Sequence, residues 1–583
     1  EHRVRISLNG AMLGEFQWDG LKNVEVAHTF SQSLLRDGEN SVRVTALLGS
    51  GIPYSVVYVD SLELTYRRRY EAVDNQLLAR GDGNAVITAT GFSSSRIRVL
   101  DVNDPANPVL LKGVRVEVDG GLYRASFMPS GPSVPYQVVA LDATPPPAAI
   151  LVDSRSKLRT PDNAAEYVAI TVPELASAAE TLAAHRRSKG LSAKVVMLED
   201  IYDEFSDGLT EPPAIRRFLR YATQQWAVPP QYVLLAGEGT YDYLNARGTG
   251  DNLVPTMLVP TPHGLQASDG WYADFDNELV PQLAIGRLPA LNAAELDRLV
   301  AKVIAYENGE GGRWKQDVLL AADNPDDGGD FPGSSDHVES LTPPDYTVQR
   351  VYLSDHTLPE ARALLLSAFN RGSIFVNYFG HGGLDLMASE RLFDIAAANT
   401  LTNAARQPVV VSLSCAIGQF ALPGFDCLSE VLMLSPGGAV AVWSPSGASY
   451  NKGANALADI FYRQVFREGE AILGDAILKA LRQYEVPGLT YMKGIYNLLG
   501  DPAMKLAGVA FIRPGSTLES WQGEVFSDEE LDEESFGAFD ADPDGDGVPN
   551  LMEYAMGWNP HVADGDGRIM IFGPWELGIG DAI

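Results

Sequence analysis

The chain has 583 residues, of which 45% are hydrophobic and 21% are charged, and its formal net charge is −32 at pH 7. This length predicts roughly three to five domains, and the acidic balance argues against nucleic acid or an anionic membrane as a partner. No apolar run reaches about 18 residues, so no transmembrane segment is expected.

Residues 1–150 are predicted to form one or two all-β sandwich modules. Short alternating segments rich in Val, Leu and Tyr recur there, separated by turn residues such as Asn9-Gly10. The expected strands are Val4–Leu8, Ser41–Ala46, Ser61–Tyr66, Ala85–Thr90, Ser95–Leu100, Gly113–Val118 and Tyr136–Leu141. The run Thr144-Pro145-Pro146-Pro147 then favours a stiff linker.

The pattern changes to alternating strands and helices from Glu166 onward, and residues 156–309 are predicted to form a first α/β unit. The expected strands are Tyr167–Val172, Lys194–Leu198 and Tyr232–Ala236. The expected helices are Pro173–Lys189, Pro213–Trp226 and Ala293–Glu307. Such βαβ alternation indicates a parallel sheet covered by helices.

A second α/β unit is predicted for residues 310–513. Its strands are short, β-branched and aromatic, which is typical of strands buried on both faces. They are expected at Asp317–Ala322, Ser373–Phe379, Pro408–Ser414 and Gly438–Trp443. The accompanying helices are expected at Pro359–Asn370, Gly453–Arg467 and Ala471–Tyr484.

The four strands of this second unit are followed or ended by polar or reactive residues, namely Asp323, His381, Cys415 and Ser444. Because parallel strands share one carboxyl edge, where ligands bind, these side chains are expected to lie together. A thiol beside an imidazole is the basic machinery of a cysteine peptidase. A lone cysteine is more often a core residue, but the three glycines around His381 permit close approach of a substrate chain.

The expected roles follow from this chemistry. Cys415 would attack a carbonyl as its thiolate, and His381 would promote ionisation and protonate the leaving amine. The backbone N–H groups of Gly382, Gly383 and Cys415 are the candidates for an oxyanion hole. Asp323 can fix the imidazole tautomer, although a solvent-facing loop acid is an equally open interpretation.

The segments around the histidine and the cysteine resemble the catalytic pair of the gingipain family of cysteine peptidases. The resemblance rests on Asn377-Tyr378-Phe379-Gly380-His381-Gly382-Gly383 and on Leu413-Ser414-Cys415-Ala416-Ile417-Gly418-Gln419-Phe420. It extends over about residues 156–510 through Ser268-Asp269-Gly270-Trp271-Tyr272, Ala284-Ile285-Gly286-Arg287-Leu288-Pro289 and Leu499-Gly500-Asp501-Pro502-Ala503-Met504-Lys505-Leu506.

This resemblance implies two caspase-like subdomains, with the catalytic pair in the second, and protein or peptide substrates. The family's acidic residue near the histidine falls at Asp323, an Asp where the best-known members carry Glu. By sequence order Asp336 is the candidate for the acid that selects arginine in some members, and Trp443 and Ser444 are assigned with it to substrate binding. Because the family includes a secretion-system sortase, a transpeptidase is kept as an alternative.

The C-terminal region is predicted to be an acidic linker at 514–539 followed by a calcium-binding repeat at 540–567. The loop Asp542–Glu553 fits the pattern D-x-D-x-D-G-x5-E of calcium loops. Its expected ligands are Asp542, Asp544, Asp546, the Val548 carbonyl, Asn550 and Glu553. The calcium would be structural, and no cofactor is expected for catalysis.

The leading hypothesis is therefore a secreted or cell-surface bacterial cysteine endopeptidase, since calcium is plentiful outside cells. The alternative is a non-catalytic surface protein that binds glycans through aromatic side chains of residues 1–150. Cys427 follows no strand and is predicted to be structural, and two cysteines exclude a disulfide scaffold. The chain begins at Glu1 without methionine, and 568–583 starts a further segment, so we expect a piece of a longer precursor.

Overall fold

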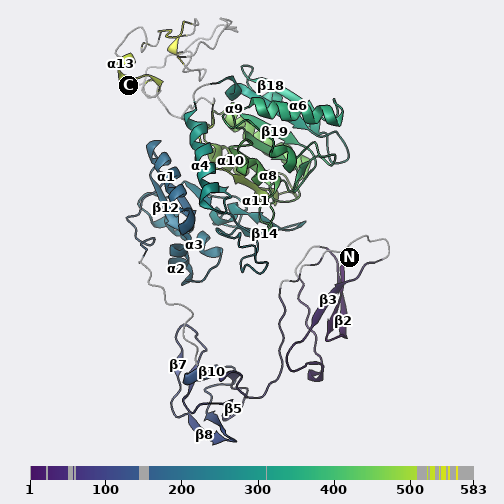
Figure 1. Cartoon of the computed structure of the whole chain (residues 1–583), viewed down its shortest axis with the longest axis vertical. Helices are drawn as coiled ribbons and strands as arrows, with labels where there is room; N and C mark the ends of the chain where they lie inside the picture. Colours follow the sequence, from purple (N-terminus) through teal and green to yellow (C-terminus); the bar gives the residue numbers. More distant parts are fainter. Residues whose placement is uncertain are drawn as a thin grey trace, which may run out of the picture. The chain divides into compact units, whose positions relative to one another are not determined.

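The computed structural model describes residues 2–20, 24–49, 57, 59, 61–143, 156–309, 312–507, 522, 525–531, 538, 540–545, 549–551 and 560–561. It divides into two compact units, Glu1–Ser154 and Arg155–Ile583 (Figure 1). Within the described ranges, no helix is both long enough and apolar enough to cross a bilayer.

The described part of the first unit contains three β-sheets, all antiparallel. One sheet has the order β2-β1-β3 and is built from β1 (His2–Leu8), β2 (Ala11–Trp18) and β3 (Val42–Ala46). The other two have the orders β4-β10-β6-β7 and β5-β9-β8. Their strands are β4 (Gln76–Arg80), β5 (Ile87–Phe92), β6 (Ile97–Asp101), β7 (Val109–Leu110), β8 (Arg115–Asp119), β9 (Leu122–Phe127) and β10 (Pro135–Ala140). Alternate residues of these two sheets, such as Ile87, Val99 and Tyr136, pack into one shared core.

The segment Ser61–Tyr66 alternates like a strand, yet residues 61–69 form no regular structure. Leu62 and Leu64 stay exposed there. Alternation produces a strand only where a neighbouring strand accepts its backbone hydrogen bonds, and this segment has no ladder partner among the described residues.

The second unit is organised around one ten-stranded sheet with the order β12-β11-β13-β16-β25-β24-β23-β19-β17-β18. Its neighbouring strands are parallel except for β24 and β25. The first half contains β11 (Tyr167–Thr171), β12 (Ala193–Met197), β13 (Tyr232–Ala236) and β16 (Ala284–Leu288). The second half contains β17 (Asp317–Ala322), β18 (Thr347–Tyr352), β19 (Phe375–Phe379), β23 (Val409–Leu413), β24 (Ala441–Pro445) and β25 (Tyr496–Leu499).

Helices flank this sheet (Figure 1). The first half carries α1 (Ala176–Ser188), α2 (Leu198–Ser206), α3 (Pro213–Gln225) and α4 (Ala293–Asn308). The second half carries α5 (Phe331–Leu341), α6 (Leu358–Arg371), α7 (Ile395–Ala398), α8 (Leu428–Leu434), α9 (Asn451–Phe466), α10 (Leu473–Gln483) and α11 (Met492–Ile495). Helices α2 and α3 pack together over Val168 and Val233, whereas α1 covers the opposite side chains Ala169 and Leu234.

Smaller elements complete the described chain. They are the hairpin β14 (Met257–Thr261) and β15 (Gly264–Ser268), the short strands β20 (Gly382–Gly383), β21 (Leu386–Met387) and β22 (Phe393–Asp394), the helix α13 (Asp528–Leu531), and the 3-10 turns η1 (Gln32–Leu34), η2 (Leu141–Ala143), η3 (Pro173–Leu175), η4 (Asp269–Ala273) and η5 (Arg313–Gln316).

The predicted α/β architecture of the catalytic region is confirmed. Two strands, β13 and β17, have the predicted bounds, and every predicted helix of this region is present within a few residues. The two predicted subdomains share one continuous sheet, because β25 comes from the second but pairs with β16 of the first through Arg287 and Leu499.

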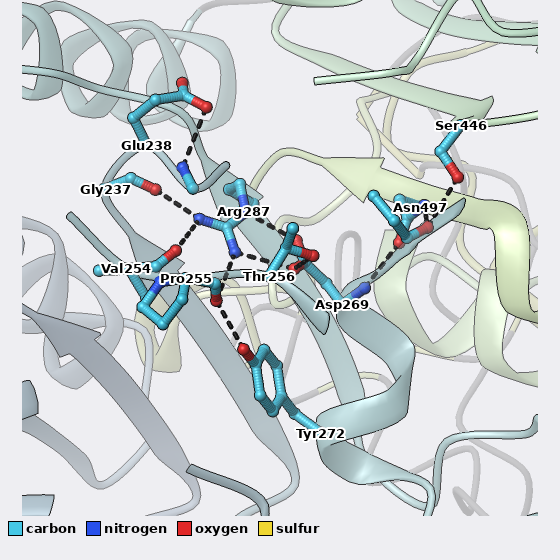
Figure 2. A network of polar contacts seen from close by, with 12 residues as sticks. Gly237, Glu238, Val254, Pro255, Thr256, Asp269, Tyr272, Arg287, Ser446 and Asn497 are labelled. Carbon is cyan, nitrogen blue, oxygen red and sulfur yellow. Dashed lines mark hydrogen bonds and ion pairs between the residues drawn. The ribbon is translucent and has the colours of Figure 1, made fainter. Parts of the chain in front are cut away.

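A buried arginine holds the middle of this sheet together (Figure 2). Arg287 of β16 is fully buried and pairs with Asp269 at distances of 2.7 and 2.8 Å. Its remaining donors reach the backbone oxygens of Gly237 and Val254, both at 2.7 Å. Asp269 in turn accepts from Thr256 and donates its backbone N–H to the Asn497 side chain on β25. Such complete pairing is what allows two charges to be buried.

A second buried network ties the end of the domain to its beginning. Arg186 on α1 contacts Asp501, just after β25, at 2.9 Å and Glu307 on α4 at 2.8 Å. Tyr167 of β11 donates to the same Asp501 carboxylate at 3.2 Å. The motifs at 268–272, 284–289 and 499–506 thus form the structural seam of the sheet.

Candidate active site

The proposed catalytic residues follow three adjacent strands whose ends are in register. Ala322 of β17, Phe379 of β19 and Leu413 of β23 are paired across the sheet. The residues immediately after these strands therefore leave the sheet at the same level of its carboxyl edge. This arrangement brings Asp323, the His381 loop and the Cys415 loop together, as the strand-end placement predicted.

Glycines on both sides of His381 allow its loop to pack directly against its neighbours. A Cβ at Gly380 would lie 2.6 Å from the Asp323 Cβ. A Cβ at Gly382 would lie 2.6 Å from the Cys415 carbonyl oxygen and 2.8 Å from the Ser414 hydroxyl. Both positions exclude any larger residue. The Gly-His-Gly pattern is thus a requirement of the close contact between the histidine and cysteine loops.

Asp323 contacts the backbone of the histidine rather than its ring. One carboxylate oxygen accepts from the His381 backbone N–H at 3.2 Å, and the other accepts from the Asn324 backbone N–H at 2.9 Å. The residue is only 2% exposed, and burial raises the pKa of its carboxyl group. In this geometry Asp323 fixes the loop that carries the imidazole.

The carboxylate that reaches the imidazole belongs to Asp326, which the sequence did not single out. Its Oδ2 lies 2.8 Å from His381 Nε2, and the hydrogen bond from His381 lowers the pKa of Asp326. Phe331, the first residue of α5, packs edge-on against the same ring with centroids 5.4 Å apart. The imidazole is therefore oriented by a carboxylate on one side and an aromatic ring on another.

Cys415 lies in a partly enclosed position, held by the backbone of Ser449. Its Sγ donates to the Ser449 carbonyl and accepts from the Ser449 N–H, both at 3.4 Å. Burial raises the pKa of the thiol, and the Ser449 N–H opposes that shift. No hydrogen bond joins Sγ to the His381 ring in the described part of the chain.

The backbone changes direction sharply after the cysteine. Ala416 has a φ of 52°, in the left-handed region that non-glycine residues rarely adopt. Its N–H is tied to the Gly447 carbonyl at 2.9 Å. Such local strain is maintained only where the surrounding structure enforces it, and it is concentrated at functional sites.

The three residues assigned to substrate binding lie in different surroundings. Trp443 and Ser444 are buried in β24, where the indole packs against Phe461 and the serine hydroxyl lies 2.9 Å from that of Ser429. Asp336 lies on α5, is about half exposed, and accepts from the Tyr352 hydroxyl at 2.8 Å. In the described part of the chain, none of the three forms a hydrogen bond or ion pair with Cys415 or His381.

Of the candidate oxyanion donors in the histidine loop, Gly382 lies against the backbone of Cys415. Gly382 and Gly383 form β20, which pairs with β21 next to the cysteine loop. The second cysteine, Cys427, is fully buried at the start of α8, and burial raises the pKa of its thiol well above the usual range. A thiol in that environment is inert.

The predicted calcium loop lies partly outside the described residues. Asp546, Val548 and Glu553 belong to that undescribed part. Asp542 accepts from the Gly545 N–H at 3.0 Å, and Asn550 donates to the Ala538 carbonyl at 2.8 Å. Among the residues that the structure describes, no three metal-binding side chains converge. The calcium site stays a prediction.

The model of peptidase family C25 matches residues 160–507, more than half of the chain. The chain belongs to peptidase family C25. The matched region begins before β11 and ends after β25, so it covers the whole ten-stranded sheet and both buried networks.

The chain is also similar to individual proteins and solved structures. Gingipain R2 and gingipain R1 of Porphyromonas gingivalis are each 23% identical over 345 residues, which is 55% of this chain and 43% and 32% of the respective relatives. The chain thus matches less than half of the length of these curated relatives. A crystal structure described as the Arg-specific cysteine proteinase gingipain R is 20% identical, with a TM-score of 0.49 over 60% of this chain and 79% of that one. Dimeric latent PorU from the same organism is 18% identical, with a TM-score of 0.36 over 52% and 32%.

Proposed function

We propose that this protein is a cysteine endopeptidase that hydrolyses peptide bonds of protein substrates with Cys415 as nucleophile and His381 as general base and acid. The observation that carries the proposal is the register of β17, β19 and β23, which places the three loops at one edge. Membership in peptidase family C25 supports it.

The two aspartates divide the work of positioning the histidine. Asp326 holds His381 Nε2, which leaves Nδ1 as the ring nitrogen able to take the thiol proton. Asp323 holds the backbone N–H of the same histidine. A carboxylate on the far nitrogen fixes the tautomer and stabilises the imidazolium that forms when the thiol ionises.

The reaction begins from a resting thiol. In this structure Sγ is paired with Ser449, and its buried surroundings favour the neutral form. A bound peptide carbonyl would draw the thiolate away from Ser449 while His381 takes the proton. The thiolate then adds to the carbonyl carbon, the imidazolium gives its proton to the leaving amine, and water later cleaves the thioester. The adjoining backbone N–H groups of Cys415 and of Gly382 or Gly383 are proposed to hold the oxyanion.

The proposal can be tested with a thiol-directed peptidyl probe that labels only activated cysteines. The probe is expected to label Cys415, located by mass spectrometry, and to block casein cleavage in proportion to labelling. Cys427→Ala is the matched control and should label normally, because Cys427 is fully buried. Labelling at Cys427, or casein cleavage that continues after Cys415 is fully labelled, would contradict the proposal.

We further propose that the protein acts outside the cell and that its tail is stabilised by calcium at Asp542–Glu553. The support is the complete ligand pattern in the sequence, whose converging carboxylates would repel each other without a cation. Calorimetric titration should show one calcium bound per chain. Asp544→Asn should weaken binding, whereas the control Asp564→Asn, in a fragmentary acidic repeat, should not. Absence of heat in the unaltered chain would reject the site.

A further inference from the structure

A cavity of about 890 Å³ opens on the second unit, away from the proposed catalytic edge. It is lined by Arg313, Arg371 and Arg406, with Asp317 as the acidic residue among its lining residues. Asp317 begins β17, whereas the catalytic loops follow the end of that strand. Six residues of strand span roughly 20 Å, so this arginine cavity lies at the opposite edge of the sheet.

The three arginines retain donors for a ligand. Arg371 donates to the Ser367 hydroxyl at 3.0 Å and to Gln349, and Arg406 donates to the Asn370 carbonyl at 3.0 Å. A guanidinium has five N–H donors, so most of them remain unused by these contacts. The Arg406 side chain packs closely against Gly372 at the side of the cavity. Gly372 has a φ of 89° and no Cβ, which leaves room for the Arg406 side chain.

A basic cavity is conspicuous in a chain with a net charge of −32. The strongest source of negative charge within the chain is its own C-terminal region. Six of the seven residues from Asp528 to Glu534 are acidic, and no lysine or arginine occurs between Arg513 and Arg568. Guanidinium groups bind carboxylates through paired, charge-assisted hydrogen bonds.

The catalytic domain ends beside this cavity. The Ala507 N–H donates to the Tyr306 hydroxyl at 3.1 Å, and the Tyr306 ring packs against Trp314 with centroids 5.8 Å apart. Trp314 is itself a wall of the arginine cavity. About 20 residues separate Ala507 from Asp528 and can span up to roughly 70 Å when extended, so the acidic segment is within reach.

We propose that the arginine cavity is the docking site for the chain's own acidic segment, Asp528–Glu534. The Glu530 carboxylate accepts from the Ser527 N–H and hydroxyl at the start of α13, so the other carboxylates of the segment are the ones that pair with Arg313, Arg371 and Arg406. The tether of about 20 residues raises the effective concentration of the segment at the cavity. Because the cavity lies at the edge opposite Cys415, docking fixes the tail without obstructing the proposed active site. The proposal does not depend on the protein being a peptidase.

The first test measures how accessible the acidic segment is in the full chain. A glutamate-specific endopeptidase is expected to cleave within Asp528–Glu534 at least about tenfold more slowly in the unaltered protein than in R313Q/R371Q/R406Q at low salt. Glutamine keeps the aliphatic stems and removes the charges. At 1 M salt, where the screening length falls to about 3 Å, the two rates should converge.

The matched control is R43Q/R98Q/R220Q, which removes three exposed arginines outside the cavity and gives the same net charge. It should cleave like the unaltered protein. Equal cleavage of the unaltered chain and the cavity variant at low salt would overturn the proposal. Faster cleavage of the control to the same extent would also overturn it, because net charge alone would then explain the effect.

The second test supplies the segment from outside. A labelled synthetic peptide of residues 524–534 is titrated into a full chain whose own segment is neutralised by D528N/E529Q/E530Q/D532N/E533Q/E534Q. Saturable binding is expected, weakened at least about tenfold when the three cavity arginines are also replaced. Binding of inorganic phosphate without binding of this peptide would overturn the proposal, since the cavity would then accept a small anion rather than this segment.

Discussion

The two halves of the ten-stranded sheet both place charged residues near their strand ends, but they use them differently. In the first half, Glu238 follows β13 and Arg287 lies within β16, and both are buried and hydrogen bonded. In the second half, His381 and Asp326 are both more than one third exposed, and Cys415 is partly accessible. A charged residue near a strand end thus stabilises the sheet when its partners enclose it. It is a candidate reactive residue when solvent and substrate can reach it.

The difference between the two halves of the sheet can be tested most directly at Cys415. Cys415→Ala is expected to reduce peptidase activity by at least about 10³-fold, because the nucleophile is lost. The stability of the protein should change little, since a methyl group replaces the thiol in the same space. Casein turnover and urea unfolding of the same preparation measure both effects. Activity at the level of the unaltered protein would remove Cys415 from the mechanism.

Replacing a buried residue of the structural seam should instead lower the stability of the protein. Arg287→Met is expected to lower the free energy of unfolding by about 3–5 kcal/mol, because Asp269 would remain buried without its partner. Urea unfolding measures the loss. In the double variant with Asp269→Asn the loss should be smaller than the sum of the two single losses. An unchanged unfolding midpoint in Arg287→Met would show that the pair does not hold the halves together.

The assignment of the two aspartates can be sharpened by kinetics. Asp326→Asn is expected to lower kcat by about 10–100-fold with little change in KM, because it disturbs the tautomer and orientation of His381. Asp323→Asn, which changes a contact to the backbone, should lower kcat less. If the Asp323 variant loses more activity than the Asp326 variant, the two roles are reversed.

The smallest expected effect is a pH dependence of stability caused by Glu238 in the first half of the sheet. Burial raises the pKa of Glu238 to about 7, and burial together with Glu238 raises that of Glu430. A carboxyl group whose pKa is raised in the folded state binds more protons folded than unfolded, so stability should fall as pH rises from about 4.5 through about 7. Glu238→Gln should flatten this fall, by about 1–3 kcal/mol between pH 5 and 8. Parallel pH profiles of urea midpoints for both proteins would contradict it.

Much of this architecture could be predicted from local sequence pattern. The runs at 232–236 and 317–322 are apolar, short and bounded by polar residues, and the strands have those bounds. Helix α5 was missed because Gly333 and two serines weaken its helical pattern. The helix forms since Asp330 caps it, accepting from the Gly333 N–H at 3.0 Å. The four residues of β25 are too few to give a periodic signal.

The candidate site was predictable only where its residues adjoin strands. His381 and Cys415 follow buried runs directly, and the sequence therefore placed them at one edge. Asp326 lies three residues further along a Pro- and Gly-rich loop, where an acid is usually solvated. Its position beside the imidazole depends on how that loop folds back, as Gly328 shows, since a Cβ there would lie 2.9 Å from His381 Cε1. Only the three-dimensional structure contains that information.

The position of β25 has a consequence for how the protein is made. This strand is the last of the sheet to be synthesised, yet it lies in the centre of the sheet between β16 and β24. A nascent chain that has not reached Tyr496 can form each half but has no strand with which to join them. Because domains generally fold as units during synthesis, closure of the sheet is expected to wait for almost the entire family C25 region. The order of synthesis would thereby delay assembly of the ten-stranded sheet until Tyr496–Leu499 has left the ribosome.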